Sequence, residues 1–373
     1  MTDETKHIIR EMPKRYPTNG TFELTVRCNL KCKMCLFRHD DSENNILMSN
    51  ELTADQWIDM AHQVADAGTM NLLITGGEPL LRPDFCEIWE GIYKQGFMIE
   101  LYTNATLVTP KIMETLKKYP PHRIGITIYG ASAETYEKTC GNGHAFKKML
   151  EGVHMLLTLP SVFEFRTTLI QDNFGDGDAI DDLVEKEFGS NYKVTQAAPI
   201  NKSVRGACAH VEKCRVQPEL DVKKKVERKL VSAQKLVGDR LKIKGMTIKQ
   251  EKKTIPDGEV RYSLFGCEAG MTQYTITYDG KLLACQMIGA FFTDTLKNGF
   301  QKAWNDFPSQ VHIPNTKIKC DTCQYVDTCL SCYGSRYAET GDFNGCSDYI
   351  YEIAKARKKY ETIGEIDYEK CKI

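Results

Sequence analysis

The sequence lacks any apolar run that approaches the roughly 18–20 residues needed to span a bilayer, which argues against a membrane-spanning protein. Its N-terminus, MTDETKHIIREMPKRY, lacks a charged-then-apolar signal pattern, so we expect a cytoplasmic location. An excess of charge is also lacking, because 49 Lys and Arg residues balance 50 Asp and Glu residues. That balance leaves no electrostatic footprint for nucleic acid or for an anionic membrane surface. Internal repeats and low-complexity stretches are absent as well.

Cysteine, by contrast, is abundant: the chain of 373 residues contains 15. Because cytosolic thiols are kept reduced, this number does not indicate a disulfide framework, and metal ligation, redox chemistry or burial remain. Three cysteines cluster near the start and seven crowd into the last third, while five are scattered and are assigned to burial or chance by default. In that order they are Cys28, Cys32 and Cys35; Cys267, Cys285, Cys320, Cys323, Cys329, Cys332 and Cys346; and Cys86, Cys140, Cys208, Cys214 and Cys371.

Between residue 21 and about residue 200, short β-like runs alternate with amphipathic helical patterns. Six strand-then-helix units predict a parallel sheet with right-handed crossovers. Six units do not close a standard eight-stranded barrel, so we predict an open or partial barrel, with a doubly wound sheet as the alternative. In either fold the chemistry belongs at the carboxyl ends of the strands. The predicted strands are 21–27, 71–75, 98–103, 123–129, 162–170 and 192–200, and the predicted helices are 53–68, 84–95, 110–118, 145–159 and 178–188.

The alternation of strand and helix patterns ends after this region. Residues 217–240 are predicted to form a long, charge-rich helix that bridges to a C-terminal module, its charges forming a solvated face. Runs 274–278 and 281–285, joined by Asp279-Gly280, predict a β-hairpin. We therefore expect an N-terminal segment (1–20), a barrel (21–215), a bridging helix or linker (216–255) and a Cys-rich domain (256–373).

The loop after the first predicted strand reads Cys28-Asn-Leu-Lys-Cys32-Lys-Met-Cys35, a CxxxCxxC pattern. Its CxxC half alone is typical of a zinc or thioredoxin-like site. Three thiolates with no fourth ligand in the loop do not by themselves close a structural zinc site. They do suit a [4Fe–4S] cluster in which one iron is left free for another ligand.

Two further motifs follow neighbouring strands: Thr75-Gly76-Gly77-Glu78-Pro79 and Tyr102-Thr103-Asn104. The glycines permit close backbone approach to a ligand, although on its own GGEP could also be an ordinary tight turn. Together with CNLKCKMC, these motifs resemble the S-adenosylmethionine (SAM) site of the radical SAM superfamily. The resemblance covers roughly residues 21–200.

The resemblance implies an α/β protein with a partial (β/α)6 TIM-like barrel. Cys28, Cys32 and Cys35 would hold the catalytic [4Fe–4S] cluster, whose fourth iron would be chelated by the amine and carboxylate of SAM. Met34 stands where the family usually has an aromatic residue and offers adenine a comparable apolar surface. The residues implied to bind SAM are Met34, Gly76, Gly77, Glu78 and Pro79; Thr103 and Asn104, near the ribose or carboxylate; and Arg166, which would pair with the carboxylate or be a plain surface charge.

The C-terminal cysteines taken alone would favour a pair of zinc knuckles, because CxxC…CxxC is a common zinc signature. Following the radical SAM motifs, they resemble the SPASM extension, a C-terminal Cys-rich domain that binds auxiliary iron–sulfur clusters. Its pattern has three residues between the last two cysteines of the CxxC block, whereas Cys329 and Cys332 are separated by two. The resemblance implies one cluster on Cys320, Cys323, Cys329 and Cys346, and a second on Cys267, Cys285 and Cys332, whose open iron could take Cys208, Cys214, water or a substrate thiolate.

The family resemblance also implies the chemistry: reductive cleavage of SAM yields a 5′-deoxyadenosyl radical that abstracts a substrate hydrogen, and auxiliary clusters accept the electron left behind. We therefore expect a cytoplasmic oxidoreductase that cross-links a ribosomally made peptide through a thioether or carbon–carbon bond. Its expected partners are that peptide, whose leader would bind directly or through a separate leader-binding protein, and a flavodoxin- or ferredoxin-type electron donor, with no nucleic acid and no membrane.

Several alternatives stay open. A radical SAM dehydrogenase of a sugar or cyclitol is the runner-up, and a protein maturase of the sulfatase-maturase type is disfavoured because Gln286 stands where those enzymes have a catalytic Asp. A zinc-binding interaction module is the non-enzymatic alternative. Cys140 is either a hydrogen donor to a substrate radical or a buried structural thiol, and we favour the latter.

Overall fold

The computed structural model describes residues 14–196, 200–237, 263–313 and 319–360. The chain divides into two compact units, Met1–Arg215 with Val260–His312 and Val216–Glu259 with Ile313–Ile373. Residues 263–312, expected in the C-terminal Cys-rich domain, belong to the unit that contains the barrel.

The barrel unit is built on one nine-stranded sheet with the order β6-β5-β4-β3-β2-β1-β7-β8-β9. The first six strands pair in parallel and in consecutive order, which confirms the predicted strand-then-helix units and the mostly parallel α/β fold. The predicted hairpin is also confirmed, since β7 and β8 pair antiparallel. The strands are β1 (Asn19–Glu23), β2 (Asn71–Thr75), β3 (Met98–Thr103), β4 (Arg123–Thr127), β5 (Val162–Thr167), β6 (Val194–Gln196), β7 (Gln273–Ile276), β8 (Lys281–Leu283) and β9 (Thr293–Asp294).

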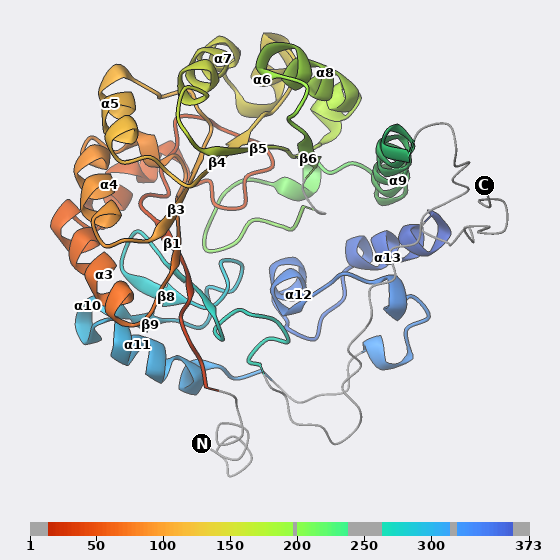
Figure 1. The fold of residues 1–373 in the computed structure, drawn as a ribbon. Helices are drawn as coiled ribbons and strands as arrows, with labels where there is room; N and C mark the ends of the chain where they lie inside the picture. The colour runs from red at the N-terminus through yellow and green to blue at the C-terminus, as the bar shows by residue number, and fades with distance from the viewer. Residues whose placement is uncertain (1–13, 197–199, 238–262, 314–318, 361–373) are drawn as a thin grey trace, which may run out of the picture. The chain divides into compact units, whose positions relative to one another are not determined.

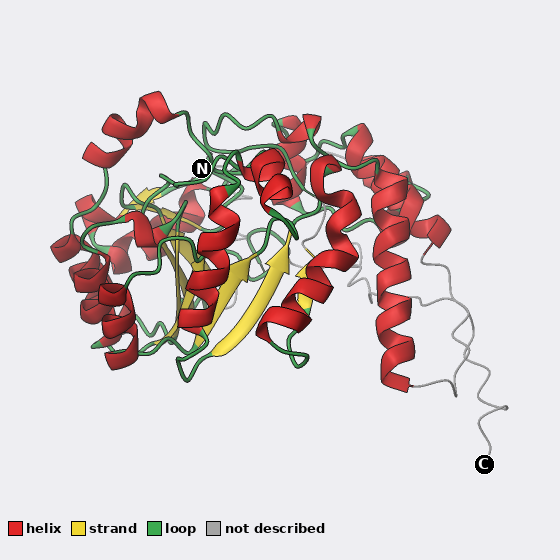
Figure 2. Cartoon of the chain, turned by 90° about the horizontal axis from the view of Figure 1, so that it is seen from above, coloured by secondary structure: helices red, strands yellow, loops and turns green. Residues whose placement is uncertain are grey.

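The helices between the parallel strands form an arc on the outer side of the sheet (Figure 1). Viewed from above, the strands lie inside this row of helices (Figure 2). The helices of the barrel unit are α2 (Asn44–Ser49), α3 (Ala54–Asp66), α4 (Phe85–Tyr93), α5 (Pro110–Lys118), α6 (Ala133–Cys140), α7 (His144–Leu156), α8 (Gly177–Phe188), α10 (Thr295–Asn298) and α11 (Phe300–Asp306).

Helix α3 shows how local sequence and packing agree. Thr53 and Gln56 form a capping box that satisfies free N–H groups at its start, and Gly68 with φ +97° ends it as expected. Trp57 lies on its buried face with no exposed surface, and its ring centroid is 4.8 Å from that of Phe22 on β1. This contact packs α3 against the outer face of β1.

The second unit is helical in its described part. Its helices are α9 (Pro218–Val237), α12 (Tyr333–Thr340) and α13 (Asp348–Tyr360). Val222 of α9 packs with Ile353 and Ala356 of α13 in a small apolar core. The long helix expected at 217–240 is thus present as α9, whereas α12 and α13 were not predicted.

Across the described ranges, no helix combines the length and apolar character needed to cross a membrane.

Candidate active site

The CxxxCxxC loop lies directly after β1, and its three thiols are within electrostatic range of one another. Burial raises the pKa of Cys28, and the neighbouring thiols Cys32 and Cys35 raise it further. Burial likewise raises the pKa of Cys35, to about 11. Thiols that resist ionisation in the free protein release protons when a metal binds, because the thiolate is the ligand form.

Two other segments hold this loop in place. Lys31 N–H donates to Cys140 O at 2.8 Å and Lys33 N–H to Thr139 O at 3.0 Å, both at the end of α6. The thiol of Cys140 is fully buried and hydrogen-bonds the thiol of Cys32, the largest cause of the raised pKa of Cys32. This placement fits a buried structural thiol against the loop.

A segment near residues 203–214 covers the other side of the loop. Val204 N–H donates to Leu36 O at 3.0 Å and Cys208 N–H to Arg38 O at 2.8 Å. The thiol of Cys214 lies 3.6 Å from Lys33 O. Of the two thiols considered above for an open auxiliary iron, Cys214 therefore packs against the CxxxCxxC loop, and Cys208 packs against Arg38 just beyond it.

The GGEP turn is pressed against the chain that leads from β1 to the cysteines. Gly77 N–H donates to Thr25 O at 2.6 Å and Glu78 N–H to Arg27 O at 3.0 Å. A Cβ at Gly76 would lie 2.2 Å from Thr25 O, and one at Gly77 would lie 2.3 Å from Arg27 O. The glycines thus permit close packing of backbone on backbone, which is a different reason from the ligand approach inferred from the sequence.

Glu78 connects this turn to the end of β3. Its carboxylate accepts hydrogen bonds from the Thr103 hydroxyl at 2.8 Å, from Asn104 N–H at 2.8 Å and from Leu80 N–H at 3.1 Å. Because the carboxyl group is fully buried, desolvation raises its pKa to about 7 despite these donors. The side chain therefore titrates near neutral pH.

Asn104 connects Glu78 to the cysteine loop. Its side-chain nitrogen lies 3.8 Å from Cys28 Sγ and donates to Asn29 Oδ1 at 3.0 Å. Asn29 also donates to the Thr106 hydroxyl at 2.8 Å. Asn29 and Thr106 were not among the predicted site residues, and the only signal for Asn29 was its place inside the CxxxCxxC motif.

The other predicted SAM-binding residues are placed as follows. Met34 and Pro79 are buried, and Pro79 begins a short 3-10 helix, Pro79–Leu81. Arg166 on β5 forms an ion pair with Glu164 at 2.7 Å and stacks over the Tyr102 ring at 4.0 Å. It therefore has partners within the protein on the strands that flank the site.

In the second unit, the thiol of Cys346 lies within electrostatic range of three other C-terminal cysteines. Burial raises the pKa of Cys346, and the neighbouring thiols of Cys320, Cys329 and Cys323 raise it further. This is the quartet that the sequence pattern implied for one auxiliary cluster. The other three are divided between the units, Cys267 and Cys285 in the barrel unit and Cys332 in the second. Within the described residues, no three His, Cys, Asp or Glu side chains are arranged to hold a single metal ion.

The fold and site define a class of protein: an α/β partial barrel with three cysteines and a GGEP turn at the carboxyl edge of adjacent parallel strands. Residues 22–181 match the family described as the Radical SAM superfamily, so this part of the chain is a radical SAM domain. The recognition made from CNLKCKMC, TGGEP and YTN is confirmed.

The chain is also similar to other known proteins. The chain is 26% identical to the AdoMet-dependent heme synthase of Methanosarcina barkeri over 86% of this chain and 93% of that protein. It is 25% identical to AlbA, the antilisterial bacteriocin subtilosin biosynthesis protein of Bacillus subtilis, over 85% of this chain and 67% of AlbA. The structure of Streptococcus suis SuiB bound to its precursor peptide SuiA matches with a TM-score of 0.66 and 15% identity, covering 93% of this chain and 78% of SuiB, which shows a shared fold.

Proposed function

We propose that this radical SAM enzyme binds a [4Fe–4S] cluster through Cys28, Cys32 and Cys35 and cleaves SAM at the carboxyl edge of its barrel. The observation that carries this assignment is the hydrogen-bonded path from Cys28 through Asn104 to Glu78, which joins the cysteine loop to the GGEP turn. Three thiols within electrostatic range suit a cluster with one iron open to SAM. When bound, the cluster supplies the electron that divides SAM into methionine and a 5′-deoxyadenosyl radical.

The side chains around the site bind and orient SAM in this proposal. Glu78, with Gly76 and Gly77, faces the cationic amine, which favours the ionised carboxylate. Thr103 and Asn104 lie at the ribose or carboxylate, and the buried Met34 and Pro79 exclude water beside adenine. Arg166 would take the SAM carboxylate as an additional partner beside Glu164.

We further propose that residues 313–373 carry a SPASM-like auxiliary cluster on Cys320, Cys323, Cys329 and Cys346, with Cys267, Cys285 and Cys332 assigned to a second one. The raised pKa of Cys346 beside the other three thiols of its quartet supports the first set. Cys320, Cys323, Cys329 and Cys346 would hold a cluster that supplies an acceptor for one electron. A substrate that also gives up one hydrogen atom and one proton would then be oxidised by two electrons.

A ribosomally made peptide is the substrate we propose, oxidised to a thioether or carbon–carbon cross-link. AlbA, which is named for biosynthesis of the bacteriocin subtilosin, and SuiB, seen with a precursor peptide, support this class. The enzyme would then work in the cytoplasm with an electron donor of the flavodoxin or ferredoxin type and a separate leader-binding protein.

An iron tetrapyrrole is the second candidate substrate. It is favoured by the heme synthase of M. barkeri, which this chain matches over 93% of that protein's length. A peptide encoded beside this gene that becomes two hydrogen atoms lighter would support the first candidate. Oxidation of an iron porphyrin, seen in its absorption spectrum, with an unchanged peptide would support the second.

The SAM-cleaving function is tested by changing Cys28, Cys32 and Cys35 together to Ala. We expect the reconstituted variant to release no 5′-deoxyadenosine from SAM and reductant, because no cluster remains to deliver the electron, while its auxiliary-cluster absorbance persists. Chromatography of the nucleoside products and visible spectroscopy provide the two measurements. Continued turnover in the triple variant would refute the assignment of the catalytic cluster, and a colourless wild-type protein with bound zinc would favour the interaction module.

A further inference from the structure

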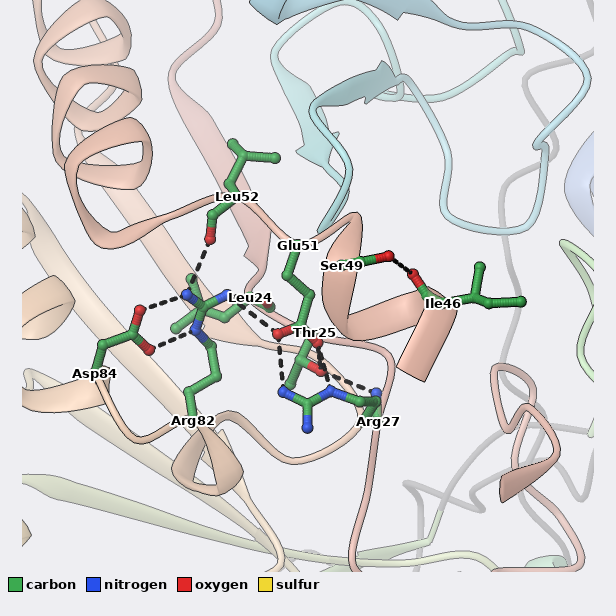
Figure 3. A network of polar contacts seen from close by, with 9 residues as sticks. All are labelled: Leu24, Thr25, Arg27, Ile46, Ser49, Glu51, Leu52, Arg82 and Asp84. Carbon is green, nitrogen blue, oxygen red and sulfur yellow. Dashed lines mark hydrogen bonds and ion pairs between the residues drawn. The ribbon is translucent and has the colours of Figure 1, made fainter. Parts of the chain in front are cut away.

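Four charged side chains of the barrel unit form a network whose centre is buried (Figure 3). Glu51 and Arg82 lie at its centre, with side chains only 6% and 5% exposed, and Arg27 and Asp84 lie on either side. The two carboxylates balance the two guanidinium groups in charge. Because a buried ion is costly unless partners complete its hydrogen bonds, removal of one member leaves an uncompensated charge.

Glu51 holds the segment that leads from β1 to the first cysteine. Its carboxylate accepts from Arg27 Nε at 2.8 Å and from Arg27 Nη2 at 2.9 Å, in a bidentate pair. It also accepts from the Thr25 hydroxyl. Arg27 directly precedes Cys28, and Thr25 O receives the N–H of Gly77, so Glu51 is bound to the residues on which the GGEP turn packs.

Arg82 connects the other side of the turn to the same carboxylate. Its Nη1 donates to Leu24 O at 3.0 Å and lies 3.5 Å from Glu51 Oε2, while Nη2 donates to Leu52 O at 2.9 Å. The carboxylate of Asp84 accepts hydrogen bonds from Arg82 Nε at 2.9 Å and from Arg82 Nη2 at 2.6 Å. Since Arg82 directly follows the helical turn Pro79–Leu81, its position is coupled to that of Glu78.

Leu52 anchors the network to the rest of the barrel unit. Its N–H donates to Tyr278 O at 2.8 Å, while its carbonyl accepts from Arg82. The next residue, Thr53, is the N-cap of α3. Both backbone groups of Leu52 are thus bonded, which restricts the movement of the adjacent Glu51.

We propose that Glu51 is a positioning residue for SAM: its carboxylate keeps the cysteine loop and the Gly76–Pro79 turn in one fixed relative position. This inference rests on the proposed SAM-cleaving function of that site. An ionised carboxylate can accept from both guanidinium groups and the Thr25 hydroxyl at once, whereas the amide of Gln offers one acceptor oxygen and adds donors that face Arg27.

The test compares E51Q and E51D with the wild-type enzyme after cluster reconstitution. In E51Q we expect an iron content close to wild type and a SAM affinity roughly tenfold lower, the size of effect typical when support behind a metal site is removed. The SAM-induced change in the electron paramagnetic resonance spectrum of the reduced cluster, titrated with SAM, measures this affinity. E51D keeps the charge but shortens the side chain by one methylene group, so it is expected to recover only part of the lost SAM affinity.

The matched control is D221N in helix α9 of the second unit. Asp221 is also a buried carboxylate, 7% exposed, with an ion pair to Lys225 at 2.7 Å. D221N is expected to lower the unfolding temperature and leave SAM affinity unchanged. If E51Q loses stability as D221N does but binds SAM like the wild type, Glu51 is only structural and the proposal is overturned.

Two further outcomes keep the interpretation clear. If E51Q does not fold, E51D provides the test instead. Its shorter side chain is expected to weaken SAM binding by a factor smaller than that expected for E51Q, at near-normal stability. A SAM affinity in E51D equal to that of the wild type would then overturn the proposal. A wild-type protein that holds its cluster but neither binds nor cleaves SAM would overturn the proposed function itself, irrespective of Glu51.

Discussion

At the residue scale, the buried carboxyl group of Glu78 joins the GGEP turn to the end of β3. It accepts hydrogen bonds from the β3 end and from its own turn, yet its pKa of about 7 shows that desolvation outweighs those donors. The motif TGGEP indicated that this residue belongs to the site. Its protonation behaviour depends on complete burial by residues far away in the sequence.

The raised pKa of Glu78 predicts a pH-dependent stability. Below about pH 4.5 the group is protonated in both the folded and the unfolded chain. As the pH rises from about 4.5 to about 7 the unfolded chain loses its proton first, so the free energy of unfolding falls, and above pH 7 the loss is complete at roughly 3 kcal/mol. Urea unfolding of iron-free wild type and E78Q should therefore show the wild type losing stability relative to E78Q between pH 5 and pH 8. If the difference in free energy of unfolding between wild type and E78Q were the same at pH 5 and pH 8, this prediction would be wrong.

Arg166 shows a limit of prediction at the same scale. Its strand position indicated a side chain near the SAM carboxylate, and the structure places it in an ion pair with Glu164 and over the ring of Tyr102. Glu164 and Arg166 lie on the same strand, β5, and Tyr102 reaches them from β3 across β4, where Gly125 pairs with both Tyr102 and Glu164. Register across a sheet is set by tertiary pairing and was not readable from the separate strand patterns.

At the element scale, the contact between the GGEP turn and the chain after β1 decides the geometry of the site. Gly76 has φ +152°, and its missing side chain leaves room for Thr25 O. Gly68, after α3, also has a positive φ of +97°, but a Cβ there would meet nothing within 4 Å. Both glycines have a backbone conformation that is unfavourable for other residues, but only at Gly76 would an added side chain also clash.

Substitution of each glycine by Ala tests this distinction. G68A is expected to reduce the free energy of unfolding by roughly 1 kcal/mol, the cost of the backbone conformation alone. G76A adds a clash of backbone against Cβ and is expected to lose at least about 3 kcal/mol or fail to fold. Urea unfolding curves of both variants measure the difference. Equal losses in the free energy of unfolding would show that the close approach of Thr25 O to Gly76 does not affect stability.

The regular elements of the barrel were the most predictable feature of the fold. Strands β2 and β3 match the predicted ranges, and α5 begins at Pro110 as its sequence indicated. Helix α6 was not predicted, because its eight residues, AETYEKTC, are largely polar and too short to show a clear period. Yet the end of α6 supplies the carbonyl groups that hold Lys31 and Lys33 of the cysteine loop.

At the scale of the whole molecule, the two compact units divide the cysteines. The thiol of Cys346 lies within electrostatic range of Cys320, Cys323 and Cys329 in the second unit, while the CxxxCxxC loop belongs to the barrel unit. Separate units allow one cluster to be removed while the other is kept. This separation is the basis for a test of the auxiliary site.

Cys346→Ala is predicted to lose about four iron atoms per chain, the content of one [4Fe–4S] cluster. Release of 5′-deoxyadenosine should continue, because the loop at Cys28 is unchanged, whereas oxidation of the substrate should stop for want of an electron acceptor. Iron analysis and product analysis measure these two effects. Cys86→Ala, which changes a cysteine of α4 outside every predicted cluster, is the control and should keep all its iron. Unchanged iron in Cys346→Ala would refute the quartet.

The sequence alone determined what short spacings can encode: the six strand-then-helix units, the three thiols of one loop, the GGEP turn and the hairpin before Cys285. Each depends on residues within about twenty positions of one another, where periodicity and turn chemistry act directly. Only the tertiary structure decided that β7 pairs with β1, that Cys140 touches Cys32, and that Glu51 joins Arg27 to Arg82. These contacts connect residues far apart in the chain, and packing, burial and charge pairing select them only once the whole fold is formed.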